Sequence, residues 1–315
     1  MRAVARVHGY IPQHNAGAEW MLHPMLAALA TRGHDVEVHL SQPPAGRRHP
    51  WTLDGVRVFL PGTASGVRPD VLISHLENVR ITAAAARGRG VPMVVVMHNS
   101  HRQALADLEF AAPALTVANS QWMALRIPRD CLVVRPAVDP VLYTATPGSA
   151  VTLINLTAGK GGHLFWAIAR KMPGTEFLGV EGAYGEQVIP ARGLPNVTVL
   201  DAMDGRLMRD EVYARTRILL VPSDYESWGR VATEAMCSGI PVVAHRAEGA
   251  LAENLGDAAI WADRHDPEAW VEQIRRLAGP AAWEAASEAA RKRSAELDPA
   301  GELERWCEAV EALRP

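Results

Sequence analysis

The sequence has few cysteines and no long hydrophobic run. Its three cysteines, Cys131, Cys237 and Cys307, are far apart and odd in number, so they predict neither a disulfide framework nor a zinc site. No stretch is apolar over the length needed to cross a bilayer, and the apolar part of "MRAVARVHGY" is too short for a signal peptide. We therefore expect a cytoplasmic protein without a transmembrane segment.

The positive charges are unevenly distributed. Residues 1–135 contain 14 arginines, no lysine and nine acidic residues, a net charge of +5, whereas the whole chain has a net charge of −3. Such an excess can indicate an anionic partner or contact with a membrane surface, and an arginine-rich codon usage would produce it equally well. The segment "RGRG" (87–90) has no aromatic residues interleaved, so we expect no specific nucleic-acid binding.

The chain length of 315 residues suits two domains. Short β-rich segments alternate with helical ones, which predicts parallel sheets with crossover helices. A segment with three prolines and no periodicity, "RPAVDPVLYTATPGSA" (135–150), is typical of an interdomain linker. The predicted strands are 3–7, 35–40, 70–74, 92–98 and 114–119 before it and 151–156, 176–180, 196–200, 217–222 and 240–244 after it, with helices at 18–33 and from about 267.

The stretch "PSDYESWGRVATEAMCSGIPVVA" (222–244) carries the clearest chemical signal. A strand ends at Pro222 and a helix is expected to start near Gly229, which places Glu226 in the preceding loop and Glu234 near the second helical turn. A helix N-terminus attracts anions, and each carboxylate can accept hydrogen bonds from a pair of sugar hydroxyls. The spacing therefore suits a phosphate with a sugar on either side of it.

This stretch resembles the retaining glycosyltransferases of the GT-B fold, family 4, also called glycosyl transferases group 1. Their hallmark is two glutamates with seven residues between them; here Ser227 stands for a glycine of the frame and Trp228 for a phenylalanine. Segments 15–38, 69–75, 94–99 and 135–140 follow the order of the family, so the resemblance covers nearly the whole chain.

The resemblance implies an α/β fold with two Rossmann-like α/β/α domains facing across a cleft. Residues 1–142 would form the acceptor-binding domain and residues 143–296 the nucleotide-sugar domain. Residues 297–315 would form a C-terminal helix, for which a return to the first domain is one option.

The resemblance also assigns roles to residues of the stretch 222–244. Glu234 would bind the ribose hydroxyls of the donor, and Glu226 would contact hydroxyls of the donor sugar. The backbone amides of Trp228, Gly229 and Arg230 would lie near the sugar and the diphosphate, together with Ser227.

Further site residues lie outside this stretch. Lys160, in "INLTAGKGG", would neutralise the leaving diphosphate, His98 would face the donor sugar, and Gly17 would let the first loop approach the phosphate or the acceptor. Asn155 stands where the family usually has an arginine, so the charge of the leaving group would rest on Lys160 and the helix dipole, with Arg230 and Arg206 as candidates for a further cation. Neither the sequence nor the resemblance predicts a bound metal or another cofactor.

The implied function is retaining transfer of a hexose-type sugar from a UDP- or GDP-sugar to an acceptor hydroxyl. The acceptor stays open, with an anionic one favoured weakly by the basic first half. Two alternatives remain: a non-catalytic nucleotide-sugar-binding protein, and a sugar-nucleotide epimerase or phosphorylase on the same scaffold. A P-loop is excluded, because Ile154 and Gly161 stand where that motif needs a glycine and a serine or threonine.

Overall fold

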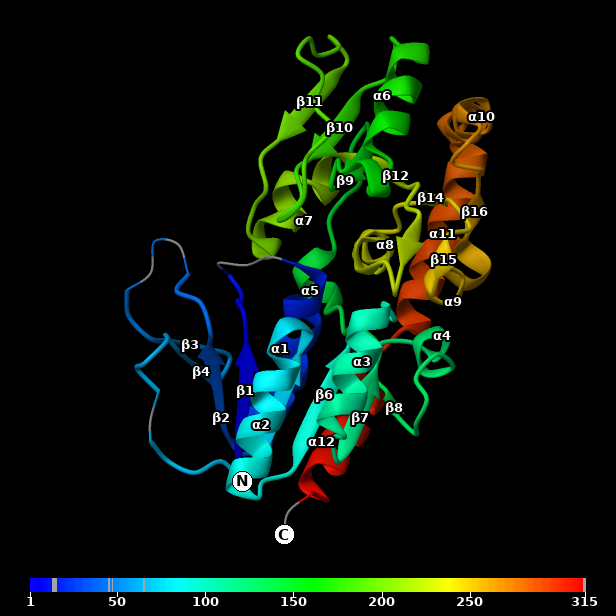
Figure 1. The fold of residues 1–315 in the computed structure, drawn as a ribbon. Coiled ribbons are helices and arrows are strands. Elements are labelled where there is room, and N and C mark those ends of the chain that lie inside the picture. Colours follow the sequence, from blue (N-terminus) through cyan, green and yellow to red (C-terminus); the bar gives the residue numbers. More distant parts are fainter. Residues whose placement is uncertain (13–15, 45, 47, 65, 314–315) are drawn as a thin grey trace. The chain divides into compact units, whose positions relative to one another are not determined.

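The computed structural model describes residues 1–12, 16–44, 46, 48–64 and 66–313 (Figure 1). The chain divides into two compact units, one of Met1–Ala137 together with the residues from Pro299 onward, and one of Val138–Asp298. The first division lies five residues before the predicted boundary at 142/143, since the short helix α5 (Pro140–Tyr143) belongs to the second unit. Each unit has its own sheet and its own hydrophobic cores.

The described part of the first unit contains an eight-stranded sheet in the order β3-β4-β2-β1-β5-β6-β7-β8. All neighbouring strands are parallel except the β3–β4 pair. The strands are β1 (Arg2–Val7), β2 (Asp35–Leu40), β3 (Trp51–Leu53), β4 (Val56–Phe59), β5 (Val71–His75), β6 (Met93–Met97), β7 (Leu115–Ala118) and β8 (Leu132–Val133). The helices are α1 (Gly17–Thr31), α2 (Val79–Arg89), α3 (Arg102–Ala111), α4 (Gln121–Ala124) and α12 (Ala300–Glu311), with a 3-10 turn at Leu76–Asn78.

Helices cover the two faces of this sheet in different places. The helices α1 and α12 pack on one face, above the alternating apolar residues of β1, β2 and β4. On the other face, α2 and α3 pack above β5, β6 and β7. The indole Nε1 of Trp306 in α12 donates a hydrogen bond of 2.8 Å to the carbonyl of Met25 in α1, so the last helix belongs to the first unit.

The second unit has a six-stranded parallel sheet in the order β11-β10-β9-β12-β14-β16, and a two-stranded ladder of β13 and β15. The strands are β9 (Ala150–Ile154), β10 (Phe177–Val180), β11 (Val197–Leu200), β12 (Thr216–Val221), β13 (Tyr225–Glu226), β14 (Val242–Ala244), β15 (Glu248–Gly249) and β16 (Ile260–Trp261). The helices besides α5 are α6 (Gly162–Lys171), α7 (Met208–Glu211), α8 (Arg230–Cys237), α9 (Leu251–Leu255), α10 (Pro267–Ala278) and α11 (Pro280–Glu296). The 3-10 turns are Ala158–Lys160, Gly205–Leu207, Tyr213–Arg215 and Gly256–Ala258.

The predicted strands agree with observed ones to within about two residues, because parallel strands buried on both faces give apolar runs that are easy to recognise. The hairpin of β3 and β4 was not predicted. Its signal is the dipeptide Asp54–Gly55, with φ of +47° and +79°, placed between two short β-prone segments. Each of its strands has only three or four residues, so periodicity alone gives a weak signal.

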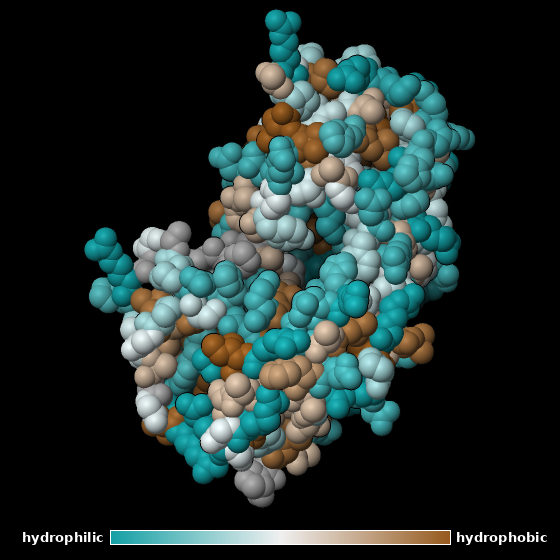
Figure 2. Space-filling model, viewed as in Figure 1, coloured by the Kyte–Doolittle hydropathy of each residue, from teal (hydrophilic) through white to brown (hydrophobic). Residues whose placement is uncertain are grey.

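The surface shown in Figure 2 is mainly hydrophilic, with small hydrophobic areas between the polar residues. The indole side chains of Trp166, Trp270 and Trp306 are buried, whereas some large apolar side chains, such as Ile81 and Leu125, are exposed. None of the helices in the described ranges combines the length and the hydropathy needed to span a bilayer.

Candidate active site

The loops after β9 and β12, neighbouring strands in the second sheet, are held against each other by backbone contacts. The amide of Asp224 donates a 2.9 Å hydrogen bond to the carbonyl of Gly159. Gly161 has φ of +91°, and a Cβ atom there would overlap Pro222 at the end of β12. The segment "GKGG" is therefore fitted to the end of the next strand, and a side chain at Gly161 would separate the two loops.

These loops bring together two residues that the resemblance selects, Lys160 and Glu226. The ammonium Nζ of Lys160 lies 2.6 Å from Oε1 of Glu226, and the hydroxyl of Ser223 donates to the same oxygen at 2.7 Å. Oε2 of Glu226 has no hydrogen-bond partner among the residues that the structure describes. Burial opposes the positive charge of Lys160, but the charge of Glu226 and the hydrogen bond to it outweigh burial, and the pKa of Lys160 is raised. Lys160 is thus held in its charged form, and Glu226 has one carboxylate oxygen left to accept hydrogen bonds.

The backbone of Glu226 is fixed by the segment around Gly249. The strand β13, which ends at Glu226, pairs in parallel with β15, and the amide of Ala250 donates a 2.8 Å hydrogen bond to the carbonyl of Glu226. Gly249 has φ of +128°, and a Cβ atom there would overlap the carbonyl oxygen of Glu226. Glycine is therefore required at 249, whereas the following position accepts the alanine found there.

The helix α8 begins at Arg230, close to the start near Gly229 that the sequence predicts. Gly229 precedes its first residue and has φ of +83°, a left-handed conformation that suits glycine. Trp228 is buried, and the amide Nδ2 of Asn254 donates to the carbonyls of Trp228 and Gly229 at 2.9 and 3.0 Å. Asn254 was not among the predicted site residues, because a single buried amide leaves no periodic signal. It fixes the turn from which the first amides of α8 point outward, a place where an anion is stabilised.

Glu234, the second glutamate, lies in α8 and is only 5% exposed. Its carboxylate forms an ion pair with Arg230, one turn earlier, and accepts a 2.5 Å hydrogen bond from the hydroxyl of Tyr213. The Arg230 guanidinium also donates to the hydroxyl of Tyr143 at 3.2 Å. Burial raises the pKa of Glu234, and the charge of Arg230 opposes this shift. The carboxylate is thus already bonded on both oxygens, and two ribose hydroxyls would have to share it with Arg230 and Tyr213.

Asn155 adopts a left-handed conformation, with φ of +70°, at the end of β9. Its Oδ1 accepts a 3.2 Å hydrogen bond from the amide of Thr157, and a Cβ atom at Gly182 would overlap its side chain. Asparagine tolerates this backbone conformation better than most residues. The side chain thus shapes its own loop and supplies no positive charge.

Other cations lie elsewhere in the second unit. Arg206 is exposed and forms an ion pair with Asp204, and Arg230 is engaged by Glu234. Arg264, which the sequence did not single out, forms an ion pair with Asp224 and donates to the carbonyl of Ala158 at 3.3 Å. Of these arginines, Arg264 is the one hydrogen-bonded to the loop that carries Lys160.

Two predicted residues belong to the first unit. Gly17 is the first residue of α1 and has free space where a Cβ atom would point; residues 13–15 of the predicted loop lie outside the described residues. His98 follows β6, and its Nε2 lies 2.9 Å from Nδ1 of His75, the last residue of β5. Burial lowers the pKa of His98 to about 4, so its imidazole is neutral at pH 7. The roles of Gly17 and His98 toward a donor remain predictions.

Comparison with solved structures defines the class of fold. A sucrose-phosphate synthase from Thermosynechococcus elongatus superposes with a TM-score of 0.81 at 15% identity, covering 99% of both chains. The Anabaena protein HepE, solved with UDP-glucose, gives a TM-score of 0.76 at 19% identity, covering 99% of this chain and 100% of that one. The fold is therefore the two-domain α/β GT-B fold, and the predicted fold class is confirmed.

Sequence comparison gives matches over part of the chain. Residues 175–279 match the sequence model of glycosyl transferases group 1. A D-inositol 3-phosphate glycosyltransferase of Corynebacterium jeikeium is 36% identical over 108 residues, which is 29% of this chain and 26% of that protein. Its counterpart in Corynebacterium glutamicum is 44% identical over 69 residues, 21% of this chain and 16% of that protein. The matched region contains the stretch 222–244 and agrees with the predicted resemblance to glycosyl transferases group 1, and the matches span 26% and 16% of these two relatives.

Proposed function

We propose that the protein is a retaining glycosyltransferase that transfers a hexose-type sugar from a nucleotide-diphosphate sugar to an acceptor hydroxyl. The observation that supports it most directly is the contact of Lys160 with Glu226, 2.6 Å, just before the first turn of α8. It combines a fixed positive charge, a carboxylate with one available oxygen and a helix N-terminus. A sugar diphosphate needs these groups in close proximity.

In this proposal, different residues of the second unit bind different parts of the donor. Lys160 and the first amides of α8, at Gly229 and Arg230, stabilise the negative charge that develops on the departing diphosphate. Glu226 accepts hydrogen bonds from the sugar hydroxyls through Oε2, since Lys160 and Ser223 hold its Oε1. We do not assign Glu226 as a nucleophile; its charge is compensated by Lys160, and the acceptor hydroxyl attacks the sugar carbon directly, on the face that the diphosphate leaves.

We assign the ribose to Glu234, which would exchange part of its contact with Arg230 for the ribose hydroxyls. Because Lys160 and α8 supply positive charge, the reaction in this proposal needs no metal ion. Among the residues described, no three His, Cys, Asp or Glu side chains are grouped so that they could hold one.

The donor and the acceptor are proposed as classes. A UDP-sugar or a GDP-sugar is the donor class, and the structure of HepE with UDP-glucose shows that the fold accommodates a UDP-sugar in that protein. The matched relatives carry a name that refers to a phosphorylated polyol, which favours an anionic acceptor for this chain as well. The acceptor would be received by the first unit, where His98 and Gly17 lie. The three free cysteines agree with the cytoplasm as its location.

The test is an assay of purified protein with a panel of UDP- and GDP-sugars. A donor that binds the native state raises the midpoint of thermal unfolding. We expect one donor to do so and to release its nucleoside diphosphate slowly in water and faster with an acceptor, with the anomeric configuration retained in the product. Binding without any release would make the protein a nucleotide-sugar-binding protein, and a free epimer or sugar phosphate would make it an epimerase or a phosphorylase.

A further inference from the structure

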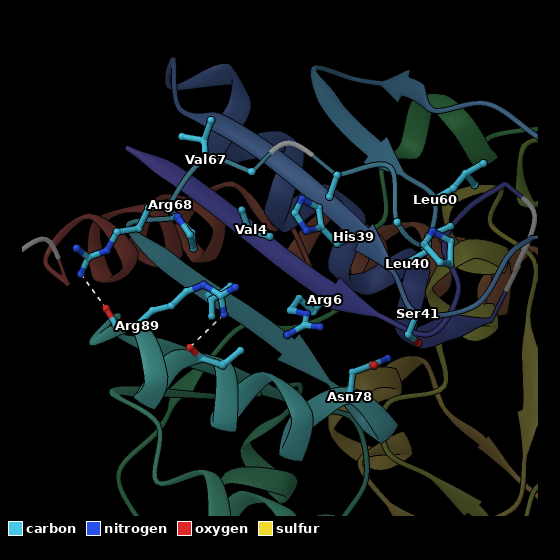
Figure 3. Close-up of a pocket in the computed structure, with 17 residues that line it drawn as sticks. Val4, Arg6, His39, Leu40, Ser41, Leu60, Val67, Arg68, Asn78 and Arg89 are labelled. Carbon is cyan, nitrogen blue, oxygen red and sulfur yellow. Dashed lines mark hydrogen bonds between the residues drawn. The ribbon is translucent and has the colours of Figure 1, made fainter.

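The first unit contains a pocket that is lined by none of the residues assigned to the proposed reaction. It has a volume of about 520 Å³ and lies on the sheet face beside β1, β2 and β5, next to α2 (Figure 3). Small-molecule sites typically have volumes of about 300–1,000 Å³, so a metabolite would fit. Three arginines, Arg6, Arg68 and Arg89, and His39 are among the lining residues, and none of the described lining residues is acidic.

The pocket lies over β1 and β2, where this face of the sheet carries charged side chains. Along β1, Ala3, Ala5 and Val7 face the core under α1, whereas Arg6 points to the opposite face, in register with His39 of β2. Strands of a parallel sheet that helices cover on both faces are apolar throughout. On this face α2 packs over β5 and β6, and the only β1 residue in the core beneath α2 is Val4, within the residues described.

The arginines of the pocket lack acidic partners. Among the residues described, the side chain of Arg6 makes no hydrogen bond or ion pair, and that of Arg89 donates one 3.4 Å hydrogen bond to the carbonyl of Ala85. The nearby carboxylate of Glu37 is already bonded by Arg2, Arg57 and His39.

The two guanidinium groups are close enough to repel each other. Figure 3 shows those of Arg6 and Arg89 pointing toward each other across the pocket. Burial and the positive charge of Arg89 lower the pKa of Arg6. Two like charges gathered in a concave site, without a neutralising carboxylate, favour an anion between them.

A third donor lines the same pocket. Asn78 lines the pocket and is 6% exposed, and its Nδ2 is buried without a hydrogen-bond partner among the residues described. A buried N–H group without a partner is costly, so it points to an acceptor that binds there.

We propose that this pocket binds the phosphate group of a small phosphomonoester. The guanidinium groups of Arg6 and Arg89 form charge-assisted hydrogen bonds to its oxygens, since guanidinium matches phosphate in geometry. The amide of Asn78 donates to a further oxygen, and the rest of the pocket holds the organic part. The inference does not depend on the proposed reaction, because no residue assigned to the donor or the acceptor lines this pocket.

The test is isothermal titration calorimetry at constant ionic strength with inorganic phosphate and with glycerol 3-phosphate. We expect Arg6→Gln and Arg89→Gln each to weaken binding of both probes by at least about tenfold, the usual effect of losing one charge-assisted hydrogen bond. Two controls keep wild-type affinity: Arg87→Gln, an exposed residue of the same helix that contacts Phe110 outside the pocket, and Lys171→Gln, whose partner in the second unit is the exposed Glu268. Arg6→Lys should bind more tightly than Arg6→Gln, because lysine restores the positive charge but not the paired N–H donors of the guanidinium group.

The outcomes separate the proposal from its alternatives. Wild-type affinity in Arg89→Gln, an exposed site where misfolding is not expected, would overturn the proposal, as would loss of phosphate binding in Lys160→Gln alone. If neither inorganic phosphate nor glycerol 3-phosphate binds, the protein is tested with vesicles of phosphatidic acid and phosphatidylcholine. Failure to bind these vesicles, or binding that does not require Arg6 and Arg89, would also overturn the proposal. If the vesicles bind and binding requires both arginines, the phosphomonoester is a lipid headgroup. Donor binding and turnover are measured on the same variants, so failure of the pocket is distinguishable from failure of the proposed reaction.

Discussion

The ammonium group of Lys160 lies 2.6 Å from Oε1 of Glu226, although the two residues are 66 positions apart in the sequence. Their strands, β9 and β12, are neighbours in a parallel sheet, so the loops at their carboxyl ends meet. Such ends of α/β sheets are where ligands bind. The side chain of Lys160 is 24% exposed and that of Glu226 is 12% exposed, so the pair is shielded but still accessible.

Removing the charge of Lys160 is expected to slow the reaction strongly. A preorganised group that stabilises developing negative charge contributes about 10²–10³ in kcat, so Lys160→Ala should lower kcat by a factor of this size. The measurement is release of nucleoside diphosphate in a coupled assay. Lys171→Ala is the matched control, because Lys171 is another lysine of the same unit whose partner is the exposed Glu268. Equal rates for the two variants would contradict the role of Lys160.

Gly249→Ala is expected to displace the backbone of Glu226, although the two residues are far apart in the sequence. The added Cβ atom would overlap the carbonyl oxygen of Glu226, and the positive φ of Gly249 adds backbone strain of about 1–3 kcal/mol. We expect a lower free energy of unfolding in urea and a loss of turnover that exceeds the loss of folded protein.

The control for this variant is Gly174→Ala, in a turn where a new Cβ atom would have nothing within 4 Å. It should change neither stability nor turnover appreciably. If Gly249→Ala behaves like this control, the ladder of β13 and β15 does not position Glu226.

Features of this site that arise from residues close in the sequence can be predicted, whereas contacts between distant residues are harder to predict. The order strand, loop and helix around Glu226 and Glu234 follows from the apolar run before Pro222 and the glycine at 229, and the structure has it so. The contact of Glu226 with Lys160 can also be foreseen, because the carboxyl ends of parallel strands lie at one edge of the sheet. The carboxylate of Glu234 is different. Its partner Tyr213 lies 21 positions away in a 3-10 turn, and no local pattern indicates this hydrogen bond.

The arginine pocket of the first unit shows the same limit. Arg6, Arg68 and Arg89 come from a strand, a connecting loop and the end of a helix, so no motif links them. The sequence shows only an excess of arginine in the first 135 residues. The three line one pocket because, among the residues described, no helix packs over β1 and β2 on this face, and composition does not reveal that.

The ion pair of Arg230 with Glu234 in α8 is expected to stabilise the folded protein. Removing one partner of a buried pair leaves the other charge uncompensated, at a cost of about 3–5 kcal/mol, so Glu234→Ala is expected to be markedly less stable in urea. Tyr213→Phe loses one hydrogen bond and should cost about 1–2 kcal/mol. Arg230→Met with Glu234→Gln removes both charges and should recover most of the stability. A double variant as unstable as the sum of its single variants would mean that Arg230 and Glu234 do not interact in solution.

A carboxylate in the first unit gives the stability a distinctive dependence on pH. Glu19, in the first turn of α1, is 2% exposed, and burial, with a further contribution from the charge of Glu77, raises its pKa from 4.5 to about 7. The folded state therefore binds more protons than the unfolded state between these values, and stability falls as the pH rises through this window. The shift corresponds to a loss of up to about 3 kcal/mol by pH 8.

The variant Glu19→Gln removes this loss. Relative to wild type, its free energy of unfolding should rise by up to about 3 kcal/mol between pH 5 and pH 8, whatever the substitution costs at pH 5. Urea unfolding at four or five pH values checks it. Groups such as His98, whose pKa is lowered to about 4, titrate alike in both proteins and cancel in the difference. Glu109→Gln, at an exposed position of α3, is the control and should give a flat difference. A flat difference for Glu19→Gln as well would show that Glu19 is ionised in the folded protein at no cost.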